Sequence, residues 1–101
     1  MYGLNQSLID DLITIFSNFQ QIDKVVLYGS RAKGNYRKGS DIDLSFFGET
    51  LNLNAIFKIQ DKIEDLDSPY LFDLSIFHQI DNPDLIDHIK RIGIEVYNAD
   101  I

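Results

Sequence analysis

The sequence predicts a small α/β fold of the α+β type, in which a mixed β-sheet of three to four strands is flanked by helices. Two patterns lead to this prediction. Apolar residues recur at three- and four-residue intervals in three segments, as in amphipathic helices. Between them lie short segments that are either β-branched and apolar or strictly alternating, as in strands. A chain of 101 residues has room for one hydrophobic core, so we expect a single domain over residues 1–101.

The helical pattern predicts helices over residues 5–20, 52–66 and 82–92. Asn5 or Ser7 can cap the first of them. Pro69 limits the second, because proline disfavours helical geometry in the residue before it. Asn82 and Pro83 have the residue types of an N-cap and a first helical position, so the third helix begins there.

The strand pattern covers residues 25–28, 41–47 and 71–77, and residues 94–97 form either a short edge strand or an extended tail. In the second of these segments the apolar residues share one parity and the aspartates share the other. We expect one face to enter the core and the other to point outward. The loop between the first two strands is short for a parallel crossover, which favours a mixed sheet.

Composition narrows the classes of partner. The net charge is −7 and there is no cysteine, so disulfides and thiolate metal sites are excluded. An acidic molecule is repelled by nucleic acid and by anionic membranes, so we expect neither as a direct partner. No apolar run approaches the roughly 20 residues of a membrane span, and no secretory signal is recognisable, which predicts a cytoplasmic protein. The basic residues are concentrated in one loop, which indicates a small anionic ligand: Arg31, Lys33, Arg37 and Lys38.

Asp41 and Asp43 are the strongest candidates for chemistry. They are two residues apart on a predicted strand, so both project from one face, with Cα atoms about 6.5–7 Å apart. Mg²⁺ prefers oxygen ligands and is commonly held by carboxylates together with substrate phosphates. Asp73 has the parity of a third member, in mid-strand between Phe72 and Leu74, where a lone aspartate is disfavoured. If its strand neighbours the first pair, the three carboxylates form a site for phosphoryl or nucleotidyl transfer.

Gly29 and Ser30 follow the first strand and fit the same task. Glycine allows close approach of the backbone to a phosphate, and the start of the following helical turn offers N–H groups and a serine hydroxyl. Arg31 is a further candidate for nucleotide contact, since arginine binds phosphate through two parallel hydrogen bonds. The residue types do not assign roles to Lys33, Arg37 and Lys38. His78 and His88 lack metal-ligand spacing, so we interpret both as structural or exposed.

Each of these motifs alone also occurs in ordinary turns and strand starts, but their combination is specific. Gly29-Ser30-Arg31-Ala32-Lys33-Gly34, then Ser40-Asp41-Ile42-Asp43-Leu44, then Asp73 on an alternating strand resembles the signature of DNA polymerase β-like nucleotidyltransferases. The amino-acid sequence of the first two motifs is similar to that of the minimal nucleotidyltransferase (MNT) branch. The resemblance is tight over residues 25–47 and looser over 71–77, and it implies the nucleotidyltransferase fold.

The resemblance also implies roles. Gly29, Ser30 and Arg31 would bind the nucleotide, Asp41, Asp43 and Asp73 would bind Mg²⁺, and Asp73 would help to deprotonate the attacking hydroxyl. Larger members carry a second helical domain for the acceptor. This sequence has no room for one, so we expect a partner protein or a neighbouring subunit to provide the acceptor.

Minimal members resemble the antitoxins of HEPN/MNT toxin–antitoxin pairs. The implied activity is Mg²⁺-dependent transfer of AMP from ATP to a hydroxyl, a tyrosine by analogy, of a HEPN toxin. The alternative is a non-catalytic antitoxin that neutralises the toxin by forming a complex. We expect a hetero-oligomer, with a homodimer as an open alternative. Transfer to a small molecule and template-directed polymerisation rank lower, because the chain is small and acidic.

Overall fold

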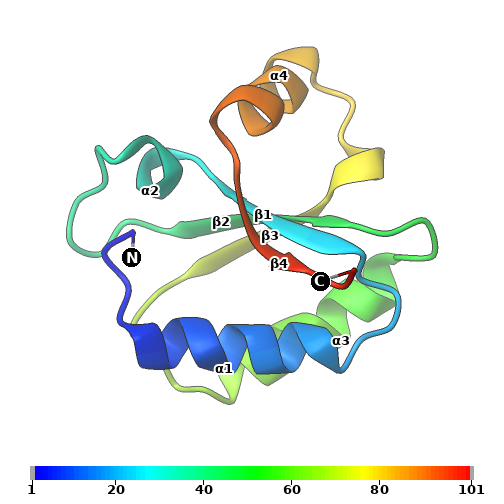
Figure 1. The fold of residues 1–101 in the computed structure, drawn as a ribbon, viewed down its shortest axis with the longest axis horizontal. Coiled ribbons are helices and arrows are strands. Elements are labelled where there is room, and N and C mark those ends of the chain that lie inside the picture. The colour runs from blue at the N-terminus through cyan, green and yellow to red at the C-terminus, as the bar shows by residue number, and fades with distance from the viewer. Residues whose placement is uncertain (1, 101) are drawn as a thin grey trace.

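The computed structural model describes residues 2–100 and confirms the expected fold class, with four strands in one mixed sheet (Figure 1). The elements in chain order are α1 (Gln6–Ser17), β1 (Lys24–Tyr28), α2 (Ser30–Lys33), β2 (Ile42–Phe47), α3 (Leu53–Glu64), β3 (Phe72–Ile76), the 3₁₀ helix η1 (Phe77–Gln79), α4 (Pro83–Ile92) and β4 (Ile94–Asn98). The segment that could have been an extended tail is therefore a strand.

The strands lie in the order β3-β2-β1-β4. β1 pairs antiparallel with both β2 and β4, whereas β2 pairs parallel with β3. The connections explain these directions. α2 and a loop join β1 to β2 without crossing the sheet, which leaves the two strands antiparallel. The helix α3 joins β2 to β3, and a helical crossover is the usual link between parallel neighbours.

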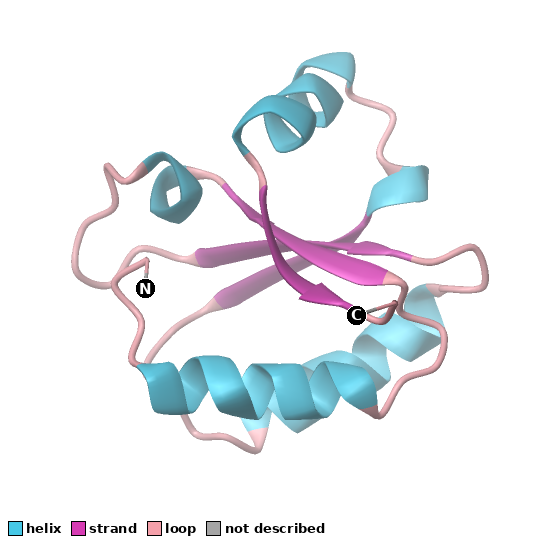
Figure 2. Cartoon of the chain, viewed as in Figure 1, coloured by secondary structure: helices cyan, strands magenta, loops and turns pink. Residues whose placement is uncertain are grey.

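Helices cover the two faces of the sheet unequally. α1 and α3 lie together across one face, and α2, η1 and α4 lie on the other (Figure 2). The main core fills the space under α1 and α3. As the alternation predicts, Ile42, Leu44 and Phe46 are fully buried there, and the rings of Phe16 and Phe46 meet edge to face with centroids 5.3 Å apart. The second face is therefore the more open one, and it carries the other parity of β2.

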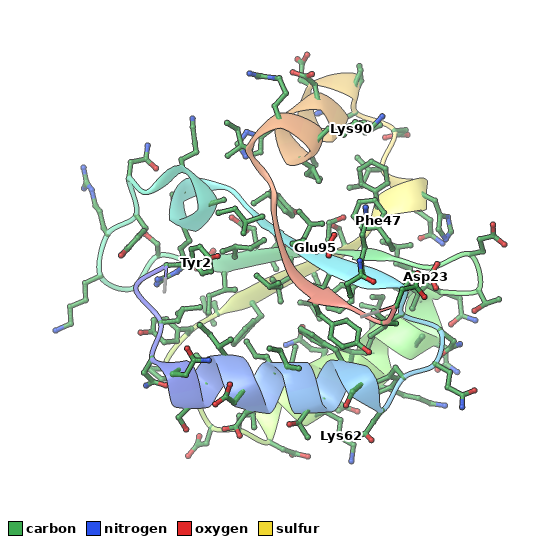
Figure 3. All side chains as sticks on the ribbon, in the orientation of Figure 1. Tyr2, Asp23, Phe47, Lys62, Lys90 and Glu95 are labelled. Atoms are coloured by element: carbon green, nitrogen blue, oxygen red, sulfur yellow. The ribbon has the colours of Figure 1, made fainter. Side chains whose placement is uncertain are left out.

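A smaller apolar cluster attaches α4 to this second face. Ile89 of α4 is buried with Val26 and Tyr28 of β1. Beside them the rings of Phe47 and Phe77 stack with centroids 4.2 Å apart, and Figure 3 shows Phe47 on the same side of the sheet as Lys90 of α4. α4 thus packs on this face along β1 and reaches Tyr28, the residue that pairs with Asp43.

The helix starts follow their sequence signals. Asn5 and Asn52 each accept a hydrogen bond from a backbone N–H three residues on, and Asn82 accepts two, directly before Pro83. The 2.8 Å bond from Leu8 N–H identifies Asn5, not Ser7, as the cap of α1. Within residues 2–100, no helix is both long and apolar enough to cross a membrane.

Candidate functional site

Three neighbouring strands bring Tyr28, Asp43 and Asp73 into one row across the open face. Tyr28 is opposite Asp43 in the antiparallel pair, and Asp43 is opposite Asp73 in the parallel pair. Residues that pair across strands project from the same face, and neighbouring strands are about 4.8 Å apart. Asp41 precedes β2 with the parity of Asp43 and is exposed. The structure thus places the three predicted carboxylates at one end of β2 and β3.

Burial and neighbouring negative charges both perturb the carboxyl of Asp43. Burial raises the pKa of its carboxyl above the usual range, and the neighbouring charges of Asp73 and Asp41 raise that pKa further. A positive charge on His88, present only when its imidazole is protonated, would act in the opposite direction and lower this pKa. Ionised Asp43 is consequently destabilised by its surroundings, and a cation beside it would relieve that repulsion.

Asp73 differs from its expected environment. The sequence indicates a costly mid-strand position, but β3 is the outer strand of the sheet and Asp73 is exposed. The expectation that Asp73 is disfavoured at this mid-strand position was therefore wrong, because its carboxylate is exposed to water at the edge of the sheet. Across residues 2–100, moreover, no three His, Cys, Asp or Glu side chains are gathered closely enough to hold a metal ion.

The residues nevertheless suit a hard cation in their chemistry. The donors are carboxylate oxygens only, which Mg²⁺ prefers. Asp43 and Asp73 pair directly between strands. Their mutual repulsion contributes to the raised pKa of Asp43, and a bound cation would offset that repulsion. The set of donors fits Mg²⁺, and metal binding by these residues stays a prediction.

The Gly29–Ser30 turn lies against Asp43. Gly29 has φ of +78°, a conformation that residues with a Cβ rarely adopt. A Cβ at Gly29 would also overlap the Asp43 carboxylate. The turn leads directly into α2, which ends at Lys33 and is followed by Gly34 in the left-handed conformation. Glycine is therefore required here by both the backbone conformation and the proximity of the carboxylate.

Arg31 has a structural position that argues against the predicted nucleotide contact. Its side chain is only 2% exposed. Nε and Nη2 donate to the Ser40 carbonyl at 3.1 and 2.9 Å, and Nη1 donates to the Tyr2 carbonyl at 2.8 Å. The guanidinium lies between the rings of Tyr36 and Tyr70, 5.1 and 4.9 Å from their centroids. All three nitrogens are occupied by backbone, so Arg31 fixes the loop that precedes Asp41.

The other basic residues of this loop point to solvent. Lys33, Arg37 and Lys38 are exposed. The loop closes in a turn in which the Arg37 N–H donates to the Ser40 hydroxyl at 2.8 Å and the Ser40 N–H donates to the Arg37 carbonyl at 2.9 Å. Arg31 and this turn together set where β2 begins. The three exposed cations form the outer surface of the loop.

His88 is the site residue that sequence reasoning missed. Its Nε2 accepts a 3.0 Å hydrogen bond from the backbone N–H of Gly29, 59 residues away. The imidazole also meets the ring of Tyr28 edge to face, with centroids 6.1 Å apart. Local spacing carries no signal for this contact, because the packing of α4 on β1 creates it. His78, by contrast, is exposed as expected.

Comparison with known proteins identifies the class. The family model described as "Polymerase beta, Nucleotidyltransferase" matches residues 10–101, and the chain belongs to this family. None of the curated proteins is significantly similar to the sequence.

Several solved structures share the fold, and toxin–antitoxin complexes are among them. One is a toxin–antitoxin with AMP-PNP, at 25% identity and a TM-score of 0.68, covering 94% of this chain and 74% of that chain. Another is the MntA–HepT toxin–antitoxin, at 19% identity and a TM-score of 0.67, with 95% and 74% covered. A third is a tri-AMPylated HEPN toxin of Shewanella oneidensis in complex with MNT antitoxin, at 20% identity and a TM-score of 0.66, with 99% and 75% covered.

Proposed function

We propose that this protein is an Mg²⁺-dependent nucleotidyltransferase that transfers AMP from ATP to a hydroxyl of a HEPN-type toxin, and so acts as its antitoxin. The observation that carries the proposal is the pairing of Asp43 with Asp73 beside the Gly29–Ser30 turn, in a member of the nucleotidyltransferase family. The similar fold found in complex with an AMPylated toxin supports the choice of acceptor.

In this proposal Asp41, Asp43 and Asp73 would hold Mg²⁺. The ion would supply positive charge to offset the negative charge of the triphosphate and of the departing pyrophosphate. Ser30 would donate its hydroxyl to a phosphate oxygen from the turn that lies against Asp43. Arg31 is not included among the nucleotide ligands, because it is buried and each of its three nitrogens already donates to a backbone carbonyl.

The transfer itself is a single displacement. The acceptor hydroxyl oxygen, a tyrosine oxygen by analogy, forms a bond to the α-phosphorus of ATP. The bond between that phosphorus and the oxygen leading to the β-phosphorus breaks, and pyrophosphate leaves with the electron pair. The hydroxyl proton passes to Asp73, whose exposed position on the outer strand makes it accessible to a residue presented by a second protein.

Transfer of labelled AMP tests the proposal. The chain is incubated with α-labelled ATP, Mg²⁺ and a co-expressed HEPN-type toxin, and label on the toxin is measured. We expect the double variant Asp41→Ala and Asp43→Ala to lose transfer by at least a hundredfold. Asp11→Asn, at an exposed position of α1, is the matched control and should retain it. Full transfer by the double variant would refute the catalytic role of the carboxylates.

The same variants separate catalysis from binding alone. In the alternative, the antitoxin neutralises its toxin by occupying the toxin surface, and the carboxylates are dispensable. Neutralisation in cells is then measured together with complex formation for Asp43→Asn. We expect this variant to form the complex and to fail to neutralise. Intact neutralisation by Asp43→Asn would establish the binding-only antitoxin instead.

A further inference from the structure

We propose that His88 is a positioning residue that sets the Gly29–Ser30 turn for nucleotide binding, an inference that rests on the proposed nucleotidyltransferase function. The side chain of His88 is joined to this turn by a 3.0 Å hydrogen bond, which the Gly29 N–H donates to Nε2. The contact joins the last helix to the turn directly after the first strand. No motif in the sequence relates these two positions.

The histidine is held on more than one side. Ile89, the next residue of α4, is buried against Val26 and Tyr28 of β1 and so attaches the helix to the strand that leads into the turn. The ring of Tyr28 packs edge to face on the imidazole. Tyr28 immediately precedes Gly29, so one helix contacts both the side chain before the turn and the first N–H of the turn.

The hydrogen bond defines the chemical state of the imidazole. Nε2 accepts a hydrogen bond, so it carries no proton, and the proton of the neutral ring is on Nδ1. The bond also occupies the Gly29 N–H. A phosphate at this turn is therefore left to Ser30, which begins α2, and the work of His88 is to fix the peptide orientation of the turn.

The conformation of Gly29 explains why such a restraint matters. With φ of +78° and ψ of −156°, this glycine is in a region of backbone space that only glycine enters readily. A glycine is also free to leave that region, because it has no Cβ to restrict it. An acceptor on α4 that holds its N–H selects the one conformation in which the turn lies against Asp43.

The test compares three variants of the full chain. In His88→Gln, Oε1 stands as many bonds from Cα as Nε2 does, so an acceptor is retained. In His88→Leu, a side chain of similar bulk has no acceptor. His78→Leu, at an exposed histidine of η1, is the control for loss of a histidine as such. Thermal unfolding of each variant verifies that it is folded at the assay temperature.

Two readouts are measured: hydrogen exchange of the Gly29 amide by NMR, and affinity for ATP with Mg²⁺ by calorimetry. We expect His88→Leu to accelerate Gly29 exchange and to weaken ATP affinity, each by about tenfold, the effect of one lost hydrogen bond. His88→Gln should restore most of both, and His78→Leu should change neither. In the wild type, imidazole ¹⁵N shifts should report a proton on Nδ1 and none on Nε2.

The outcomes distinguish this inference from the proposed function. If folded His88→Leu keeps wild-type Gly29 exchange and ATP affinity, the positioning role is overturned. It is also overturned if His88→Gln is as impaired as His88→Leu. Absence of ATP binding by the wild type would instead refute the proposed function. A selective loss of Gly29 protection in His88→Leu would then still support the positioning contact.

Discussion

Asp43→Asn should make the metal-free protein more stable. Burial and the charges of Asp73 and Asp41 raise the pKa of Asp43, so its ionised form is held in the folded state against an unfavourable field. The folded state binds the proton of Asp43 more tightly than the unfolded state does. The contribution of Asp43 to stability therefore falls as the pH rises above the ordinary aspartate pKa, near 4. Asparagine keeps the shape and removes the charge.

The spacing of the strands gives the magnitude. Two unit charges on directly paired residues, roughly 5 Å apart, repel by about 3 kcal/mol at an effective dielectric constant of 20 and about 0.8 kcal/mol in bulk water. Asp73 is exposed, which places the pair near the weaker limit. We therefore expect Asp43→Asn to raise the free energy of unfolding by about 1 kcal/mol at pH 7, or Tm by about 5 °C for a domain of this size.

Thermal unfolding in EDTA and in MgCl₂ measures the effect and its reversal. Wild-type protein at tenfold Kd of Mg²⁺ should gain about 1.4 kcal/mol, whereas Asp43→Asn should gain little. The advantage of the variant should also shrink toward pH 4, as wild-type Asp43 takes up its proton. Asp11→Asn should behave as wild type. A lower Tm for Asp43→Asn without metal, or equal gains from Mg²⁺, would refute the assignment of repulsion at this position.

Other substitutions test the parts that support the site. Arg31→Ala should lower the free energy of unfolding by about 3 kcal/mol in urea titrations, since it removes three hydrogen bonds to carbonyls and two ring contacts; a loss below 1 kcal/mol would contradict this role. Gly29→Ala should cost at least about 2 kcal/mol, because φ is positive and the new Cβ meets the Asp43 carboxylate, and a neutral result would show that the turn can relax. Phe46→Ala, at a fully buried ring, should cost about 3–5 kcal/mol by calorimetry, and a smaller loss would indicate that the core collapses around it.

The elements of the fold could be predicted because periodicity and caps are local signals. The largest errors lie at the helix ends. The first predicted helix extends to residue 20, but α1 ends at Ser17, and α3 ends at Glu64 instead of residue 66. Phe19 and Leu66 caused this, since both are apolar, both pack on the core and neither is helical. Their burial comes from the turn after each helix, which spacing alone does not reveal.

The candidate site was predictable only where its residues belong to a local sequence pattern. The positions of Gly29, Asp41 and Asp43 follow from one continuous stretch, and Asp73 follows from strand parity. Arg31 was proposed as a nucleotide contact because arginine suits a bidentate bond to phosphate, whereas tertiary packing places this cation between two tyrosine rings and against two backbone carbonyls. His88 depends on how α4 sits on β1, a contact between distant segments.

The position of β3 at the border of the sheet has a consequence for solubility. A strand without a neighbour on one side offers unpaired backbone groups to other chains, and natural sheets protect such strands with charge. The two outer strands share this device: each has one exposed residue, Asp73 in β3 and Glu95 in β4. The carboxylate proposed to take the acceptor proton therefore also guards against self-association, and replacing it with an apolar residue should increase aggregation as well as alter chemistry.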